Sequence, residues 1–297
     1  MVRTSDDTRE EGSSRRGETQ VDESLTTVVE LLSHETRARI LVTLAAHHAA
    51  SPREPELSFS ELRRAVGHDD PGNFNYHLGR LRGTLVEQTP NGYELSYVGG
   101  RFVGALLSGR FDPDADVPAV DGQTVCPLCG DPGRVTYEQG TLQVDCDAGH
   151  GARLNIGANV LAGRSVEGAL NLAWLRSVVE LRQAVEGLCP VCDGRMDGGI
   201  ERPVDDEFPV YLFTCRRCGA TFQTPPGGLV IDHPRVAALC HDHGIDPRRS
   251  AWTVLTDHVG EPRVVADDPP RVELVVTVED DRLRLRLDEN GRTLDRA

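Results

Sequence analysis

Cysteine spacing constrains the fold of this 297-residue chain more than any other feature. Seven of the eight cysteines lie in CxxC pairs or in a pair formed by a cysteine and a histidine four residues later. A CxxC turn points two thiolates at one spot, and two such half-sites can close a tetrahedral metal site. The sequence predicts two sites, made by Cys126, Cys129, Cys146 and His150, and by Cys189, Cys192, Cys215 and Cys218.

Structural zinc is the cofactor that this pattern predicts. Four-ligand sets rich in thiolates leave no open position, whereas a catalytic zinc keeps one for water or substrate. Each cysteine-containing segment is too short to bury a core of its own, so metal binding would supply folding energy. The alternatives are disulfides, which are rare inside cells, and scattered buried thiols. At the first site Asp145 or Asp147 could replace His150.

No enzyme motif accompanies these cysteines. The chain contains no HExxH, no nucleophile elbow and no phosphate loop, so we predict that it is not an enzyme. A third metal or redox site at Cys240, His241 and His243 is an alternative. The simpler interpretation is a cysteine that points inward beside histidines that face solvent, because 240 and 243 share a helix face and 241 does not.

The segment 24–110 has helix and hairpin signals in a characteristic order. A short helix is predicted to begin at Ser60, and the next begins at Asp70, whose carboxylate can cap the free N–H groups of its first turn. The apolar stripe of this second helix consists of Phe74, Leu78, Leu81 and Leu85. Asn91-Gly92 then predicts a hairpin, and a last helix is predicted over 98–108.

The stretches "SHETRARILVTL", "LSFSELRRAVG", "PGNFNYHLGRLRGTLVEQ" and "GYELSYVG" resemble the winged helix-turn-helix domains of ArsR-type archaeal transcription regulators. The resemblance implies a DNA-binding domain whose recognition helix enters the major groove. It does not extend to metal sensing, because the segment 24–110 contains no cysteine pair. A winged helix followed by zinc ribbons is also similar to archaeal transcription factor E, so a general accessory factor that contacts polymerase or promoter DNA is the alternative.

The predicted recognition helix carries amide and guanidinium groups on the side opposite its apolar stripe. Asparagine can pair with adenine, and arginine with guanine or phosphate. The candidate DNA-binding residues are Asn73, Asn75, Tyr76, Arg80, Arg82 and, on the preceding helix, Arg63 and Arg64. We expect His77 to be partly buried. One recognition helix reads few base pairs, so a homodimer on double-stranded DNA is expected.

We therefore predict an α+β, multidomain protein. The predicted segments are a disordered tail (1–22), the winged helix-turn-helix domain (23–110), a linker (111–123), a first zinc-ribbon-like unit (124–165), a connecting helix (166–187), a second zinc ribbon (188–232), and helices with a C-terminal β-hairpin (233–297). The connecting helix is expected to begin after Ser165, and its predicted apolar positions include Val178 and Val179. The two ribbon-and-helix units resemble a degenerate duplication.

Charge divides the chain in the same way. The chain has 32 arginines, no lysine and 47 acidic residues, a composition that resembles haloarchaeal proteins. Residues 24–110 hold 9 acidic residues and 9 arginines, whereas residues 111–297 hold 31 acidic residues and 19 arginines. A polyanion is therefore expected to meet the neutral segment. In the C-terminal hairpin a row of arginines is predicted to pair with carboxylates across the strands, with a second nucleic-acid surface as the alternative.

Localisation and the remaining partners follow from simpler features. The chain shows no signal peptide and no apolar run long enough to span a bilayer, so a cytoplasmic protein without membrane contact is expected. The acidic zinc-ribbon region would supply dimer contacts, bind an unknown effector or contact the transcription machinery.

Overall fold

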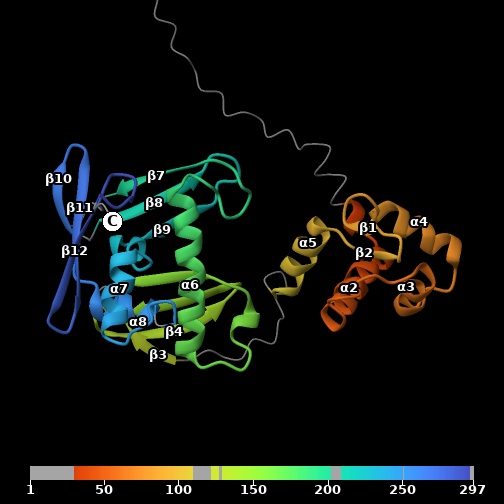
Figure 1. Cartoon of the computed structure of the whole chain (residues 1–297), viewed down its shortest axis with the longest axis horizontal. Coiled ribbons are helices and arrows are strands. Elements are labelled where there is room, and N and C mark those ends of the chain that lie inside the picture. Colours follow the sequence, from red (N-terminus) through yellow and green to blue (C-terminus); the bar gives the residue numbers. More distant parts are fainter. Residues whose placement is uncertain (1–29, 110–121, 127–128, 202–208, 250, 295–297) are drawn as a thin grey trace, which may run out of the picture. The chain divides into compact units, whose positions relative to one another are not determined.

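The computed structural model describes residues 30–109, 122–126, 129–201, 209–249 and 251–294. The chain forms two compact units that divide between Ala105 and Leu106 (Figure 1). The predicted tail (1–22) and most of the predicted linker (111–123) lie outside the described residues. Among the residues that are described, no helix combines the length and the apolar character that a membrane span requires.

The first unit follows the predicted order of helices and hairpin. Its elements are α2 (Glu35–Ala50), α3 (Phe59–Val66), α4 (Pro71–Leu81), β1 (Val86–Gln88), β2 (Tyr93–Leu95) and α5 (Tyr97–Leu107). Strands β1 and β2 pair antiparallel on either side of Asn91-Gly92. Three residues of the predicted apolar stripe, Phe74, Leu78 and Leu81, are buried in α4 and pack with Ile40 and Leu44 of α2 in one core. The prediction that Leu85 belongs to the same helix is wrong, because α4 ends at Leu81 and Leu85 is buried in the turn before β1.

Two N-terminal caps set where α3 and α4 begin. The Asp70 carboxylate accepts from the N–H groups of Gly72 and Asn73 at 2.8 and 3.2 Å, as predicted. The prediction of Ser60 as the cap of α3 is wrong by two residues. Ser58 is the cap, because it forms a reciprocal capping box with Glu61, whose carboxylate accepts from the Ser58 N–H at 2.9 Å.

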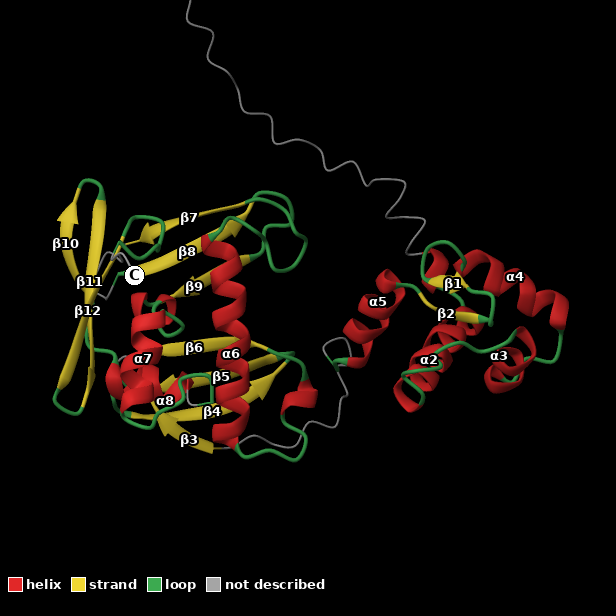
Figure 2. Ribbon diagram, viewed as in Figure 1, coloured by secondary structure: helices red, strands yellow, loops and turns green. Residues whose placement is uncertain are grey.

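The second unit is built from three antiparallel sheets and the helices between them (Figure 2). The first sheet contains β3 (Gly122–Val125), β4 (Pro132–Glu138), β5 (Thr141–Cys146) and β6 (Gly151–Asn155). The second contains β7 (Met196–Glu201), β8 (Val210–Cys215) and β9 (Thr221–Thr224), and the third β10 (Arg263–Asp267), β11 (Pro270–Val278) and β12 (Asp281–Leu287). The helical elements are η1 (Ala158–Val160), α6 (Val166–Val185), η2 (Pro226–Leu229), α7 (Pro234–Asp242) and α8 (Ala251–His258).

In Figure 1 helix α6 crosses the strands of the first two sheets; it contacts β3, β6 and β7 and contributes to both apolar cores of the unit. It begins after Ser165, whose hydroxyl accepts from the Gly168 N–H at 3.1 Å, as predicted. Val178 is buried as expected, but Val179 is 55% exposed, because the buried stripe passes through Trp174, Val178 and Leu181.

The predicted C-terminal β-hairpin is incomplete, because β10 adds a third strand. Strand β10 pairs antiparallel with β11, and β11 pairs with β12 from Val272↔Leu287 to Val278↔Asp281. One face of this sheet is apolar and buried against α7 and α8. In Figure 1 the sheet forms the blue outer layer of the second unit.

The two cysteine-containing sheets are each followed by the same succession of elements. After β6 come η1 and α6, and after β9 come η2 and α7. Helices α6 and α7 both have a side-chain cap. Ser165 accepts from the N–H three residues later at the start of α6, and His233 accepts from the N–H two residues later at the start of α7. This repeated order is what the interpretation as a degenerate duplication expects.

Candidate metal centres and nucleic-acid interface

Four cysteines converge on one point, two from the turn before β7 and two from the end of β8 and the turn that follows it. The Sγ atoms of Cys189 and Cys218 lie 3.7 Å apart, and those of Cys192 and Cys215 lie 3.6 Å apart. All four ligand atoms lie within 4.8 Å of one another. Thiolates about 2.3 Å from a tetrahedral zinc would be about 3.8 Å apart, whereas a disulfide needs about 2.05 Å. The cluster therefore has the dimensions of a metal site, and its cysteines are free thiols.

The three CxxC turns share one backbone geometry. In each, the N–H of the first cysteine donates to the carbonyl five residues later, and the N–H four residues later donates back to the cysteine carbonyl. The first bonds join Cys126 to Asp131, Cys189 to Gly194 and Cys215 to Ala220 at 2.8 to 2.9 Å; the return bonds come from Gly130, Asp193 and Gly219 at 3.0 to 3.1 Å. The returning residue has a positive φ in all three turns, of 76°, 56° and 72°.

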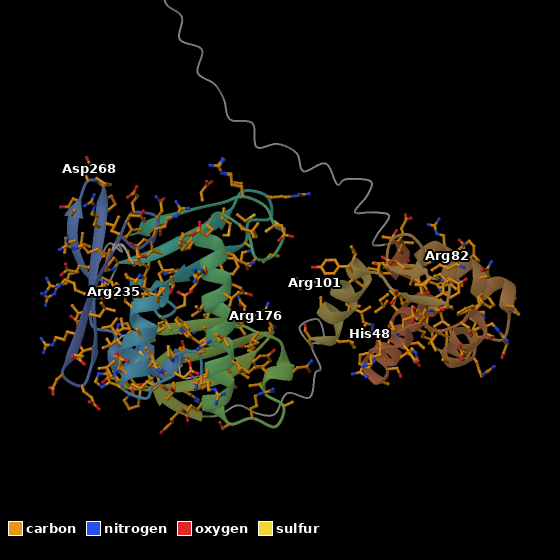
Figure 3. All side chains as sticks on the ribbon, in the orientation of Figure 1. His48, Arg82, Arg101, Arg176, Arg235 and Asp268 are labelled. Carbon is orange, nitrogen blue, oxygen red and sulfur yellow. The ribbon has the colours of Figure 1, made fainter. Side chains whose placement is uncertain are left out.

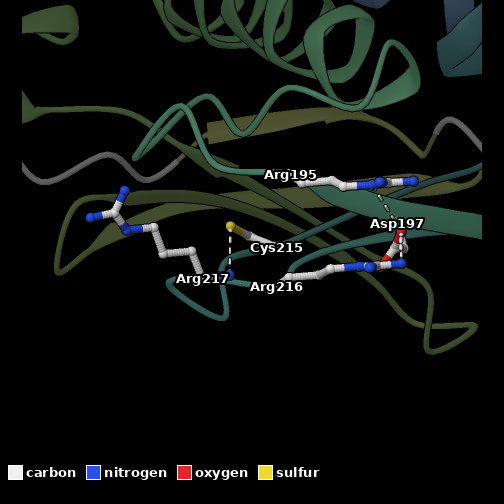
Figure 4. A network of polar contacts seen from close by, with 5 residues as sticks. All are labelled: Arg195, Asp197, Cys215, Arg216 and Arg217. Atoms are coloured by element: carbon white, nitrogen blue, oxygen red, sulfur yellow. Dashed lines mark hydrogen bonds and ion pairs between the residues drawn. The ribbon is translucent and has the colours of Figure 1, made fainter. Parts of the chain in front are cut away.

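Backbone N–H groups also point at the sulfur atoms. The Sγ of Cys215 accepts from the N–H groups of Cys218 and Arg217 at 3.5 and 3.4 Å, and the second of these is drawn in Figure 4. These bonds, that of Cys218 first, lower the pKa of the Cys215 thiol to about 6. For Cys192 the main cause is a different one, a side-chain hydrogen bond with the Cys218 thiol, which raises the pKa of Cys192 to about 12. The backbone thus favours a thiolate, the form that binds metals.

An ion network fastens the second cluster to its sheet (Figure 4). Asp197 of β7 accepts a bidentate guanidinium from Arg216, with Nη2 to Oδ1 at 2.7 Å, and Arg195 lies 3.9 Å from the same carboxylate. The bonds from Arg216 hold the pKa of Asp197 below its usual value. Because Arg216 lies between two cysteine ligands of the cluster, the network links the second CxxC turn to β7.

The first cluster combines three cysteines with His150, as predicted. Its ligand atoms lie 3.7 Å apart for Cys129–Cys146 and for Cys146–His150 Nδ1, and 3.9 Å apart for Cys126–His150 Nδ1. The Cys146 turn is one residue shorter than a CxxC turn, because the Cys146 N–H donates to the carbonyl of His150 itself. Asp145 is held elsewhere, since it accepts from Arg153 at 2.8 Å. Within the described residues, the two predicted sets are the clusters compatible with a metal ion.

Helix α4 presents the predicted DNA-reading residues on its exposed side. Asn73, Asn75, Arg80 and Arg82 are exposed, and Tyr76 is 59% exposed. A Cβ on Gly79 would meet nothing closer than an Arg82 nitrogen at 3.9 Å, so the backbone at Gly79 is open to approach.

Two of the predicted arginines make contacts within the first unit. Arg63 Nη1 donates to the carbonyls of His68 and Asp69 at 2.8 and 3.0 Å, so it joins the end of α3 to the start of α4. Arg82, which is labelled in Figure 3, donates to Gln88 Oε1 at 2.8 Å and so joins the end of α4 to β1. Arg64 is exposed at the end of α3.

A pair of histidines joins α4 to the start of α2, and sequence reasoning did not identify the pair. His77 is 4% exposed, and its ring centroid lies 3.9 Å from that of His34, which caps α2. Burial, followed by the charges of His34 and Arg37, lowers the pKa of His77. The only signal in the sequence was a histidine beside the apolar stripe of α4.

The residues of the suggested third metal site are separated. Cys240 is fully buried in the apolar core, which raises its pKa. The expectation that both histidines face solvent is wrong for His243, because it lies between two carboxylates of the β11–β12 turn. Its Nδ1 is 3.2 Å from Glu279 Oε2 and its Nε2 is 3.0 Å from Asp281 Oδ2.

Comparisons with known proteins match both units to domain families without an assigned function. The model described as "Domain of unknown function (DUF7351)" matches residues 123–293, which contain both cysteine clusters. The model described as "Domain of unknown function (DUF7347)" matches residues 26–106, which contain α4. No curated protein and no solved structure matches the chain.

Proposed function

The chain belongs to the family of the domain of unknown function DUF7351, and we propose that it is a sequence-specific DNA-binding transcription regulator with two structural zinc sites. The observation that carries this proposal is α4, an amphipathic helix whose amide and guanidinium side chains are exposed above a fully buried apolar stripe. The order of α2, α3, α4 and the hairpin supports a winged helix-turn-helix.

Base reading would be performed by short-range hydrogen bonds. Asn73, Tyr76 and Arg80 recur at intervals of three and four residues and therefore lie along one side of α4. Asparagine forms a bidentate pair with adenine, and Arg80 could reach guanine or a phosphate. The open backbone at Gly79 would let this side of α4 approach the base edges. Arg64 and the remaining donors of Arg63 would hold phosphates.

The two clusters would hold zinc in closed sites. Cys126, Cys129, Cys146 and His150 would bind one ion, and Cys189, Cys192, Cys215 and Cys218 the other. A bound zinc ion supplies four strong bonds that fix the turns and the ends of the short sheets. The same ligand sets leave no open coordination position, which supports a structural role.

A homodimer would double the number of base pairs that are read. A single recognition helix contacts only a few bases, so two-fold related half-sites would provide the needed specificity. Sedimentation of the protein with a selected duplex should give two chains for each site.

Selection of bound duplexes from a random pool tests the proposal. The wild-type protein should enrich a discrete motif, and Asn73→Ala should reduce its preference for that motif by roughly 5-fold to 150-fold, the equivalent of about 1–3 kcal/mol for a lost bidentate pair. Asn290→Ala, an exposed asparagine in the second unit, is the matched control. Binding without any sequence preference would contradict a regulator and favour a general accessory factor.

A further inference from the structure

The outward face of the third sheet carries an unusual set of side chains. The strand register places five arginines on it, which we call the arginine face: Arg263, Arg271, Arg282, Arg284 and Arg286. All five residues are exposed. The opposite face carries the buried valines and leucines of β11 and β12, so the fold fixes which side turns outward.

One carboxylate shares this face with the five arginines. Glu273 of β11 lies between Arg263 and Arg286 in the strand register, and its side chain is only 14% exposed. Arg286 Nε lies 3.0 Å and Arg284 Nε 3.6 Å from its two oxygens. Glu273 is therefore covered by arginines and neutralises only part of their charge. Among the residues that the structure describes, the predicted pairing of the arginine row with carboxylates involves Glu273 alone.

The other three arginines have no partner within the described part of the chain. No ion pair or side-chain hydrogen bond involves Arg263, Arg271 or Arg282 there, and all three guanidinium groups stay available to a ligand. The acidic β11–β12 turn lies at one end of the sheet, and two of its carboxylates, Glu279 and Asp281, are held by His243. The face itself therefore holds five arginines and one carboxylate, whereas five acidic residues lie at the ends of the sheet: Asp267 and Asp268 at the β10–β11 turn, and Glu279, Asp280 and Asp281 at the β11–β12 turn.

We propose that the arginine face binds the sugar-phosphate backbone of duplex DNA. Residues two apart on β12 point to the same side about 7 Å from each other, so Arg282, Arg284 and Arg286 form a linear row of cations. The planar guanidinium donates two parallel hydrogen bonds to a phosphate. A protein partner is disfavoured because the arginines leave only small apolar contributions on this face, from the half-buried Ala266, Val275 and Thr277, with Val265 exposed at the bulge of β10.

This binding surface goes beyond the proposed function, because phosphate contacts carry no sequence information. It would let the second unit hold DNA in any register while α4 selects the sequence. The two roles predict different effects of substitution. Removing arginines from the arginine face lowers the affinity for every duplex, whereas removing base contacts from α4 lowers the difference in affinity between the preferred sequence and other duplexes.

The test measures the affinity of the zinc-loaded full chain for a random-sequence duplex over a range of KCl concentrations. The variant Arg263→Gln/Arg271→Gln/Arg282→Gln removes three arginines that make no ion pair in the described structure. The control Arg53→Gln/Arg101→Gln/Arg235→Gln removes the same charge from exposed arginines outside both metal clusters, whose side chains also have no described partner. The zinc content of both variants is measured first, to show that they are folded.

Each phosphate contact contributes about 0.9 to the slope of log affinity against log salt concentration, so the arginine-face variant should lower the slope by roughly 2.7. The control should keep the wild-type slope to within about one contact. Equal slopes for the two variants would overturn the proposal, as would binding to polyglutamate, but not to DNA, through the same arginines. Because the duplex is random, the result does not depend on whether α4 reads a sequence.

Discussion

The Sγ atoms of Cys192 and Cys215 lie 3.6 Å apart, although 22 residues separate them in the chain. This proximity predicts that the two CxxC turns share one metal ion. The purified protein should contain two equivalents of zinc, and Cys192→Ser should contain one and lose the folded second sheet, because structural zinc binding contributes about 10–16 kcal/mol. Cys240→Ser, a buried cysteine outside both clusters, should keep two equivalents. Elemental analysis and far-UV circular dichroism provide the measurements.

The fourth ligand of the first cluster is tested by a separate pair of variants. His150→Ala should lose one zinc equivalent, because Nδ1 of His150 lies 3.7 Å from the Sγ of Cys146. Asp147→Ala should retain both, since the cluster assembles without that carboxylate. Cobalt substitution gives a second readout, because the charge-transfer bands report the number of thiolate ligands. Full zinc content in His150→Ala would show that another residue completes the site.

The positive φ of Asp193 predicts a gain in stability from glycine. Asp193 adopts a φ of 56° in the turn where the other two CxxC turns have Gly130 and Gly219. Asp193→Gly should raise the stability of the zinc-loaded protein by up to about 1 kcal/mol, because glycine reaches this region without steric cost. Gly219→Ala is the converse test, since a Cβ there meets no atom within 4 Å and only the backbone conformation is disfavoured. It should lower the midpoint of thermal unfolding.

His77 predicts that the first unit loses stability in acid. The pKa of His77 is lowered in the folded protein, chiefly by burial, so the unfolded chain binds a proton more readily. The contribution of His77 to the stability of the first unit is complete above pH 6.5, the pKa of an unfolded histidine, and it decreases as the pH falls below that value. The protection factors of the α4 amides, each the intrinsic exchange rate at a given pH divided by the observed rate, should therefore decrease in acid. His77→Leu should remove this dependence, whereas His48→Gln, an exposed histidine labelled in Figure 3, should preserve it.

His243 predicts the opposite pH dependence for the β11–β12 turn. The hydrogen bond to Asp281 and the charge of Glu279 raise the pKa of His243 in the folded protein. The contribution of His243 to stability is complete below pH 6.5, the pKa of an unfolded histidine, and it is lost as the pH rises through the raised pKa of the folded protein. The protection factors of the amides in the turn should decrease over that range. Glu279→Gln/Asp281→Asn should abolish the effect, and Asp280→Asn, the neighbouring acidic residue, should leave it in place.

Local sequence determined the elements whose signals lie within a few residues. Asp70 and Ser165 cap their helices as predicted, because a cap needs only a side chain and the N–H groups two or three residues later. The same locality explains the error at α3, where Ser58 and Ser60 are both acceptable caps and only the reciprocal bond with Glu61 selects Ser58. Strand β10 was missed because its pairing partner is another strand rather than an adjacent signal.

By itself, the sequence determined which residues could hold metal and which side of α4 is apolar, because both depend on fixed spacings along the chain. Only the tertiary structure decided that Asp145 pairs with Arg153, that Arg63 joins α3 to α4, and that His243 lies between two carboxylates of a distant turn. It also decided that five arginines share one outward face, since strand register is fixed by burial of the opposite face against α7 and α8. Such contacts join residues far apart in the chain, so no local pattern specifies them.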